Sequence, residues 1–327
     1  MNDVRLAPER LLPSGLSIVV PVYKGARTIA ELADRVARAK VDQPAWELVL
    51  VVDGSPDDSW RVVTELVARH PQVVGIDMFR NFGQHNALLA GIRAARFDVV
   101  VTMDDDLQHR PETILELVAA LTDDVDLVFG VPVEEEHGFW RNVSSRFAKV
   151  AMGATVGGDM ARHSGAFRAF RTGLRAGFEG VDDPYVSIDV LLSWVTTRYV
   201  TVVVPMDSRA VGQSNYSFRR LVRHAINMVT GYSTKPLRLV SWLGFALSLF
   251  GLLTLIVVVT RYFTVDAPVP GFAFLASLIS ILAGAQLFGL GVIGEYLGRM
   301  HFRSMQRPPY VVRQVLTRDD EPPGTRS

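Results

Sequence analysis

The chain has 327 residues, with 34 basic and 34 acidic side chains and no cysteine. Balanced charge without a dense basic block argues against a nucleic-acid partner. The lack of cysteine excludes disulfides and thiolate metal sites, and the length is typical of about two domains.

Strands and helices alternate in the first two thirds of the chain, after a tail at 1–14 that is polar, carries prolines and lacks the pattern of a signal peptide. β-Branched, apolar runs predict strands at 16–22, 46–52, 73–78, 98–103, 126–131 and 199–205. One-sided apolar patterns predict helices at 28–39, 59–69, 86–95, 111–121 and 189–194. This alternation predicts an α/β domain over 15–216, with a Rossmann-like, mostly parallel sheet and helices on both faces.

Three carboxylates, Asp104, Asp105 and Asp106, directly follow the strand predicted at 98–103. Like charges in a row resist burial. Open α/β sheets bind ligands at the carboxyl ends of their strands, and oxygen ligands suit Mg²⁺ or Mn²⁺. We therefore predict a metal-diphosphate site here, with a solvated turn as the alternative.

Two long apolar runs, 239–259 and 272–293, follow the polar domain. Each has about the 20 residues that a helix needs to cross a bilayer. A buried core helix is the alternative, but neither run shows an amphipathic face. We predict a membrane hairpin over 237–297, with spans at about 239–261 and 272–295.

Basic residues flank this hairpin on both sides, while the turn between the spans has only Arg261 near it. By the positive-inside rule, the polar domain, both termini and the tail at 298–327 are expected in the cytoplasm of a multi-pass inner (cytoplasmic) membrane protein. Residues 217–236 mix arginines with apolar residues. This pattern favours an amphipathic helix on anionic membrane lipids, with a domain-packing helix as the alternative.

Several short motifs occur together in a specific order. They are Val20–Tyr23, Val52–Ser55, Arg80–Gln84, Asp104–Gln108, Ser164–Arg168, Gly212–Ser217 and Gly294–Arg299. In this order the first four resemble the inverting family 2 glycosyltransferases, which have the GT-A fold. The later motifs and the hairpin are similar to the polyprenyl-phosphate branch of that family, which includes dolichyl-phosphate mannose synthase and bacterial polyprenyl-phosphate sugar transferases.

The resemblance implies a reaction and its partners. A sugar would move, with inversion, from a nucleotide-diphosphate sugar, UDP-linked by expectation, to an undecaprenyl-type phosphate at the cytoplasmic membrane face. The product would be used to modify a cell-envelope glycan or glycolipid. The cofactor would be Mg²⁺ or Mn²⁺. The relatives also suggest a homotetramer. A polysaccharide synthase is a weaker alternative, because the chain lacks the Gln-x-x-Arg-Trp motif and further spans. An inactive protein that binds nucleotide or lipid is the other alternative, against which the acidic triplet argues.

The resemblance also assigns site residues by their place in the motifs. Asp106 is expected as the direct metal ligand, with Asp104 as a second metal-site acid that contacts the donor. Further donor-binding residues would be Pro21, Tyr23, Asp53, Arg80, Gln84 and Asp105. Arg168, also assigned a catalytic role, would bind the acceptor phosphate together with Arg209, Ser214 and Tyr216.

Three positions depart from the family pattern. Val52 replaces an acid before Asp53, and Lys24 replaces an asparagine after Tyr23, so the base of the donor stays open. Ala166 stands where relatives often carry an acid. The lipid phosphate is itself anionic near neutral pH, so a general base is less necessary, and Asp159 or His163 remain alternatives for positioning it.

Overall fold

The computed structural model describes residues 15–39, 45–132, 160, 165–181, 186–207, 235–264, 271–305 and 307–318. The chain divides into two compact units. One holds the sheet and includes the C-terminal residues from Arg307 onward, and the other holds the two long helices.

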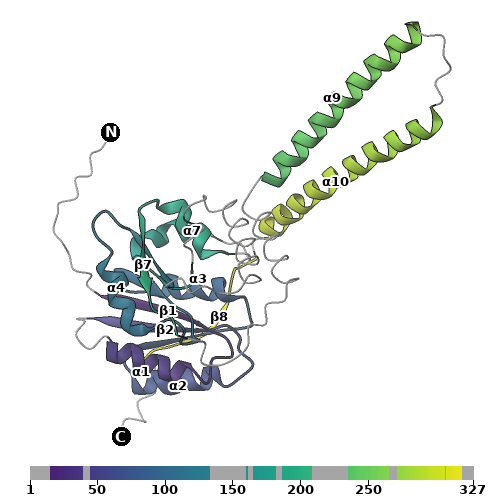
Figure 1. The fold of residues 1–327 in the computed structure, drawn as a ribbon. Coiled ribbons are helices and arrows are strands. Elements are labelled where there is room, and N and C mark those ends of the chain that lie inside the picture. Colours follow the sequence, from purple (N-terminus) through teal and green to yellow (C-terminus); the bar gives the residue numbers. More distant parts are fainter. Residues whose placement is uncertain are drawn as a thin grey trace, which may run out of the picture. The chain divides into compact units, whose positions relative to one another are not determined.

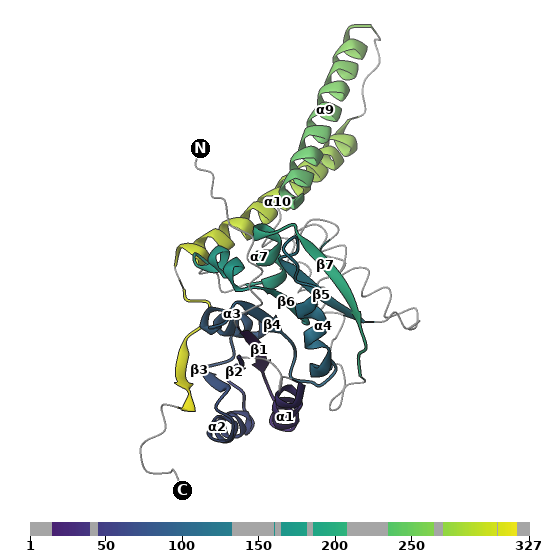
Figure 2. The same cartoon turned by 90° about the vertical axis from the view of Figure 1, so that its left-hand side faces the viewer.

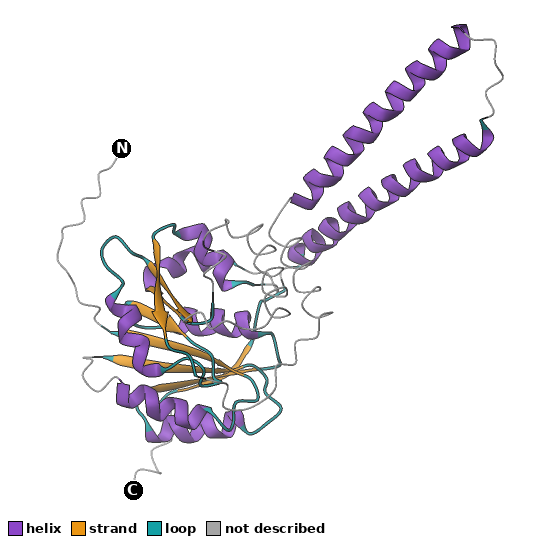
Figure 3. Cartoon of the chain, viewed as in Figure 1, coloured by secondary structure: helices purple, strands orange, loops and turns teal. Residues whose placement is uncertain are grey.

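The sheet unit is built around one sheet of eight strands in the order β7-β5-β6-β4-β1-β2-β3-β8. Figure 3 shows the strands in orange, with helices packed around them. The strands are β1 (Leu16–Val22), β2 (Trp46–Val52), β3 (Val73–Met78), β4 (Val99–Thr102), β5 (Leu127–Pro132), β6 (Arg168–Arg171), β7 (Tyr199–Val204) and β8 (Val312–Leu316). β6 runs antiparallel to β4 and β5, and β8 antiparallel to β3, while the remaining neighbours pair in parallel. The predicted mostly parallel sheet is confirmed.

Helices cover both faces of this sheet, as predicted (Figure 2). They are α1 (Ile29–Ala39), α2 (Ser59–Arg69), α3 (Gln84–Ala94), α4 (Ile114–Ala119) and α7 (Ile188–Val195), with 3₁₀ turns η1 (Pro111–Thr113) and η2 (Thr172–Phe178). On the face of α1 and α2, the apolar stripe of α1 joins Ile18 and Val20 in the main core. On the face of α3, Gly91 permits close packing, because a Cβ there would lie 2.3 Å from the side chain of Val19.

Two antiparallel strands were not expected from the sequence. β6 is four residues long and begins and ends with arginine, so it lacks an apolar run. β8 lies within the range 298–327, which we expected to be a tail beyond the hairpin. Part of that range is instead an edge strand of the sheet, hydrogen-bonded to β3.

The second unit contains α9 (Lys235–Thr264) and α10 (Phe272–Ser304), of 30 and 33 residues (Figure 1). Both contain a stretch long and apolar enough to cross a membrane, at Leu237–Thr254 and Ile281–Gly298, with mean hydropathies of 1.6 and 1.4. Neither stretch is buried inside the protein, so the alternative of a buried core helix finds no support. The two predicted spans are thus present as candidate spans, in longer helices than expected. The segment predicted as an interfacial helix lies outside the described residues, except for its last two.

Candidate functional site

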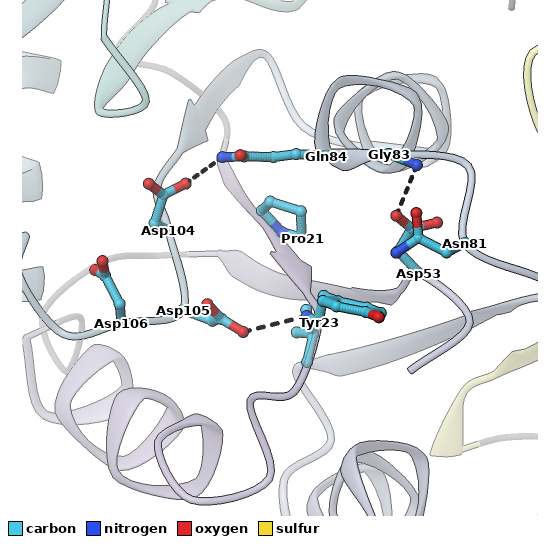
Figure 4. Close-up of a pocket in the computed structure, with 10 residues that line it drawn as sticks. Pro21, Tyr23, Asp53, Asn81, Gly83, Gln84, Asp104, Asp105 and Asp106 are labelled. Atoms are coloured by element: carbon cyan, nitrogen blue, oxygen red, sulfur yellow. Dashed lines mark hydrogen bonds between the residues drawn. The ribbon is translucent and has the colours of Figure 1, made fainter. Parts of the chain in front are cut away.

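A cavity of about 310 Å³ opens at the carboxyl ends of β1, β2 and β4 (Figure 4). We call it the acidic pocket. It is lined by Pro21, Val22, Tyr23, Asp53, Asn81, Gly83, Gln84, Asp104, Asp105 and Asp106. Parallel strands end together at this edge, which brings residues from motifs about 80 positions apart into one site.

Asp53 follows β2 and holds the loop that comes after β3. Its two carboxylate oxygens accept hydrogen bonds from the backbone N–H groups of Phe82 and Gly83, at 2.7 and 2.8 Å. Burial raises the pKa of Asp53, although these two bonds favour the charged form. Gly54, next to it, has a φ of +53°, and a Cβ there would lie 2.2 Å from the carbonyl carbon of Arg80. The turn and the loop therefore fit together only with glycine at this position.

The three successive aspartates point to different partners (Figure 4). Asp104 accepts a hydrogen bond from the side-chain amide of Gln84 at 2.7 Å, and Asp105 accepts one from the backbone N–H of Tyr23 at 3.3 Å. The carboxylate of Asp106 accepts a hydrogen bond from the backbone N–H of Gln108 at 3.1 Å. Burial, reinforced by the neighbouring charge of Asp104, raises the pKa of Asp105 to about 7.

The donor set of the acidic pocket fits Mg²⁺ or Mn²⁺. No group of three or more potential protein ligands is gathered for a metal within the described ranges. Asp105 is turned toward Tyr23, which leaves Asp104 and Asp106 as the carboxylates for an ion. Mg²⁺ is commonly bound by one or two carboxylates together with substrate phosphates and water, so two carboxylates suffice.

Two of the three arginines expected at the site, Arg80 and Arg168, lie in described parts of the chain, and neither lines the acidic pocket. Arg80 stacks its guanidinium over the ring of Phe82, 4.1 Å from the ring centroid, and does not line the cavity. Arg168 is only 1% exposed. Its guanidinium contacts Asp189 of α7 at 2.5 Å and donates to the hydroxyl of Thr102 at 3.0 Å. Arg168 therefore joins β6 to β4 and α7 in this structure, and its role toward the acceptor phosphate stays a prediction.

The remaining predicted site residues, Arg209, Ser214 and Tyr216, lie outside the described residues, as do Asp159 and His163. Three residues that the sequence reasoning did not single out matter here. Asn81 and Gly83 line the pocket, and Asp189 neutralises Arg168. The first two lie inside the motif Arg80–Gln84, so the motif itself was the available signal, whereas nothing in the local sequence marks Asp189 as a partner of Arg168.

Comparison with known proteins places the chain in a family. Residues 17–177 match the family described as Glycosyl transferase family 2. An undecaprenyl-phosphate 4-deoxy-4-formamido-L-arabinose transferase of Pseudomonas savastanoi pv. phaseolicola is 33% identical over 310 residues, which cover 94% of this chain and 92% of the relative. The enzyme of the same name from Klebsiella pneumoniae is 32% identical over 305 residues, covering 92% and 93%.

A solved structure shares the fold. Glucosyl-3-phosphoglycerate synthase of Mycobacterium tuberculosis, in complex with Mn²⁺, UDP and glucosyl-3-phosphoglycerate, superposes with a TM-score of 0.50 at 19% identity, covering 66% of this chain and 77% of that one. The family match includes the strands that build the acidic pocket, and the full-length relatives extend over the two long helices. The chain therefore belongs to glycosyl transferase family 2.

Proposed function

We propose that the protein transfers a sugar from a UDP-linked donor to an undecaprenyl-type polyprenyl phosphate, with inversion at the anomeric carbon. The observation that carries this proposal is the acidic pocket at the sheet edge in a chain that aligns, over 94% of its length, with an undecaprenyl-phosphate sugar transferase. The pocket supplies the groups for a nucleotide diphosphate, and the two candidate spans give access to a lipid acceptor.

Different residues of the acidic pocket would bind the two ends of the donor. Tyr23 and Asp53 lie together at one end, where an aromatic ring and a carboxylate suit a nucleoside. Asp104 and Asp106 lie at the other end and would hold Mg²⁺ or Mn²⁺. A bound divalent ion supplies positive charge for the diphosphate leaving group. Gln84 fixes Asp104 in place through its 2.7 Å hydrogen bond.

The reaction is a single displacement. An oxygen of the acceptor phosphate forms the new bond to the anomeric carbon as the bond from that carbon to the diphosphate breaks. The phosphate nucleophile is anionic near neutral pH, so no proton has to be removed from it. Asp159, His163 or Arg209 would contribute only to positioning the acceptor, together with Ser214 and Tyr216.

The topology proposed for the chain places this reaction at the cytoplasmic face of the inner membrane. This topology is supported by the distribution of basic residues around the two long helices. Basic residues lie before α9 and toward the end of α10, and the turn between the helices has one nearby. The product would then be a lipid-linked sugar for modification of the cell envelope, and a homotetramer stays a prediction from resemblance.

The proposal is tested by incubating the purified full chain with Mg²⁺, undecaprenyl phosphate and radiolabelled nucleotide sugars, in parallel UDP- and GDP-linked. We expect label in the chloroform-soluble fraction with a UDP-sugar and no label when undecaprenyl phosphate is omitted. Transfer from a GDP-sugar alone would overturn the choice of nucleotide. Transfer of label to a growing water-soluble polymer would favour the polysaccharide synthase, and no transfer from any common donor would favour a binding protein.

A further inference from the structure

One wall of the acidic pocket is the segment Phe79–Gly83, which connects β3 to α3 and which we call the rim segment. Its Asn81 and Gly83 line the cavity. Its far end is fixed by the carboxylate of Asp53, through the N–H groups of Phe82 and Gly83. Its near end starts directly beyond β3, at the edge of the sheet where β8 pairs.

β8 is irregular at the point where it reaches the rim segment. Gln314 lies opposite Asp77, but Val312 lies opposite Met78, so Arg313 is an extra residue on this strand. An extra residue of this kind re-aims a side chain and strengthens the local twist. The irregularity lies at the carboxyl end of β3, one residue before Phe79.

Arg313 uses this position to make three contacts with β3 and the rim segment. Its guanidinium contacts the carboxylate of Asp77 at 3.0 Å and donates to the backbone carbonyl of Phe79 at 2.9 Å. It also lies over the Phe79 ring, 5.2 Å from the centroid. The backbone pairing extends to the same residue, since the N–H of Phe79 donates to the carbonyl of Val311 at 3.1 Å.

These contacts differ from an ordinary surface ion pair. The side chain of Asp77 is only 5% exposed, so its charge is poorly solvated and depends on Arg313. The planar guanidinium bonds a carboxylate and a carbonyl at once, which a lysine ammonium on a flexible stem does less well. The rim segment is therefore held at both ends, by Arg313 at Phe79 and by Asp53 at Gly83.

We propose that Arg313 is a positioning residue of the nucleotide-sugar site: it fixes the rim segment so that Asn81, Gly83 and Asp53 are arranged before the donor binds. The nature of the ligand rests on the proposed function. When the rim segment is already ordered, binding does not have to offset the loss of conformational entropy that ordering a loop would require. The residues that follow the second candidate span thus complete a pocket whose lining residues all lie before position 107.

The test compares variants of the full chain in detergent by calorimetric titration with UDP and, in parallel, GDP, each with Mn²⁺. Arg313→Ala should weaken nucleotide binding about tenfold, which corresponds to about 1.4 kcal/mol. In turnover assays it should raise the KM for the nucleotide sugar by a similar factor while kcat changes little. Arg318→Ala is the matched control. It removes the same charge two residues beyond β8, and among the described residues Arg318 makes no hydrogen bond or ion pair with the rim segment.

A merely structural role would lower the thermal midpoint and leave the nucleotide affinity of the folded protein unchanged, and that result would overturn the proposal. If Arg313→Ala does not fold, Arg313→Lys replaces it. This variant keeps the charge near Asp77 and should still weaken binding, because its ammonium cannot reproduce both hydrogen bonds, so unchanged affinity would again refute the idea. Wild-type protein that binds nucleotide but makes no lipid-linked product would refute only the proposed function, because these titrations need no acceptor.

Discussion

At the scale of single residues, the most unusual group in the acidic pocket is Asp105. Burial and the adjacent charge of Asp104 raise the pKa of Asp105 to about 7, from an ordinary value of 3.8. The folded protein therefore binds a proton that the unfolded chain releases, over the pH range between these two values. In that range the free energy of unfolding falls as the pH rises, because the charged form of Asp105 is the unfavourable one in the fold.

Asp105→Asn should remove this pH dependence. In the presence of a chelator, thermal midpoints of the wild type should decrease between pH 5 and pH 8 more steeply than those of the variant. Above pH 7 the variant should be the more stable protein. Parallel curves for the two proteins would show that Asp105 titrates near its ordinary value.

Gly54 is the second residue whose role can be tested alone. A Cβ at this position would meet backbone atoms of Arg80 and Asn81 at 2.2 and 2.4 Å, at a φ of +53°. Gly54→Ala should therefore destabilise the protein by about 1–3 kcal/mol and displace the rim segment. Denaturant unfolding and nucleotide titration of the same variant would measure the two effects. Gly173→Ala is the control, since its Cβ would have open space.

At the scale of elements, the first half of the sheet could be predicted with accurate bounds. β1, β2 and β3 are largely apolar runs, each with a single charged or hydroxyl residue (Ser17, Glu47 and Asp77), and local pattern determines such strands. β6 and β8 could not be found in this way, because a short strand with charged ends becomes a strand only through its partners. Pairing between residues 236 positions apart, as between Asp77 and Arg313, leaves no local signal.

The site residues that could be predicted from the sequence differ from the others in their place on the sheet. Most of the predicted pocket residues lie at the carboxyl ends of parallel strands, which meet at one edge of the sheet, so their convergence could be predicted from the sequence. These residues are Pro21 and Tyr23 at the end of β1, Asp53 after β2 and the three aspartates after β4, and they are joined by Gln84 at the start of α3. Arg168 lies within β6, where the register of the sheet turns its side chain inward to Asp189. The resemblance implied a phosphate-binding role for Arg168, which stays a prediction, whereas its buried ion pair with Asp189 of α7 has no signal in the local sequence.

The pair of Arg168 and Asp189 connects β6 to α7, and its burial makes a clear prediction. Asp189→Asn would remove the counter-charge of Arg168, which is only 1% exposed. We expect the free energy of unfolding to fall by about 3–5 kcal/mol. Asp207→Asn breaks an ion pair of the same 2.5 Å length with Arg110. Because the side chains of Arg110 and Asp207 are both partly exposed to solvent, this substitution should lower the free energy of unfolding much less. If chemical denaturation gave equal decreases in the free energy of unfolding for Asp189→Asn and Asp207→Asn, this result would contradict the buried position of Arg168.

At the scale of the whole molecule, the proposed topology assigns the turn between α9 and α10 to the side opposite the sheet unit. The chain contains no cysteine, so single cysteines can be introduced into an otherwise unreactive protein. In intact cells, Asp266→Cys should react with a membrane-impermeant maleimide, while Arg318→Cys should react only after the membrane is permeabilised. Labelling of Arg318→Cys in intact cells would show that the topology is the reverse of the proposed one. Protection of both positions in intact cells would contradict the spanning hairpin.

The central claim is that the acidic pocket and the lipid acceptor act in one reaction. The most direct measurement is release of UDP from the UDP-sugar that serves as donor, by the full chain in liposomes with Mg²⁺, with and without undecaprenyl phosphate. We expect release of UDP only with the acceptor, in an amount equal to the lipid-linked product. Asp106→Asn should lose both release and product, whereas the exposed control Asp124→Asn should keep them. Release of UDP at the same rate without undecaprenyl phosphate, or unchanged turnover in Asp106→Asn, would contradict this claim.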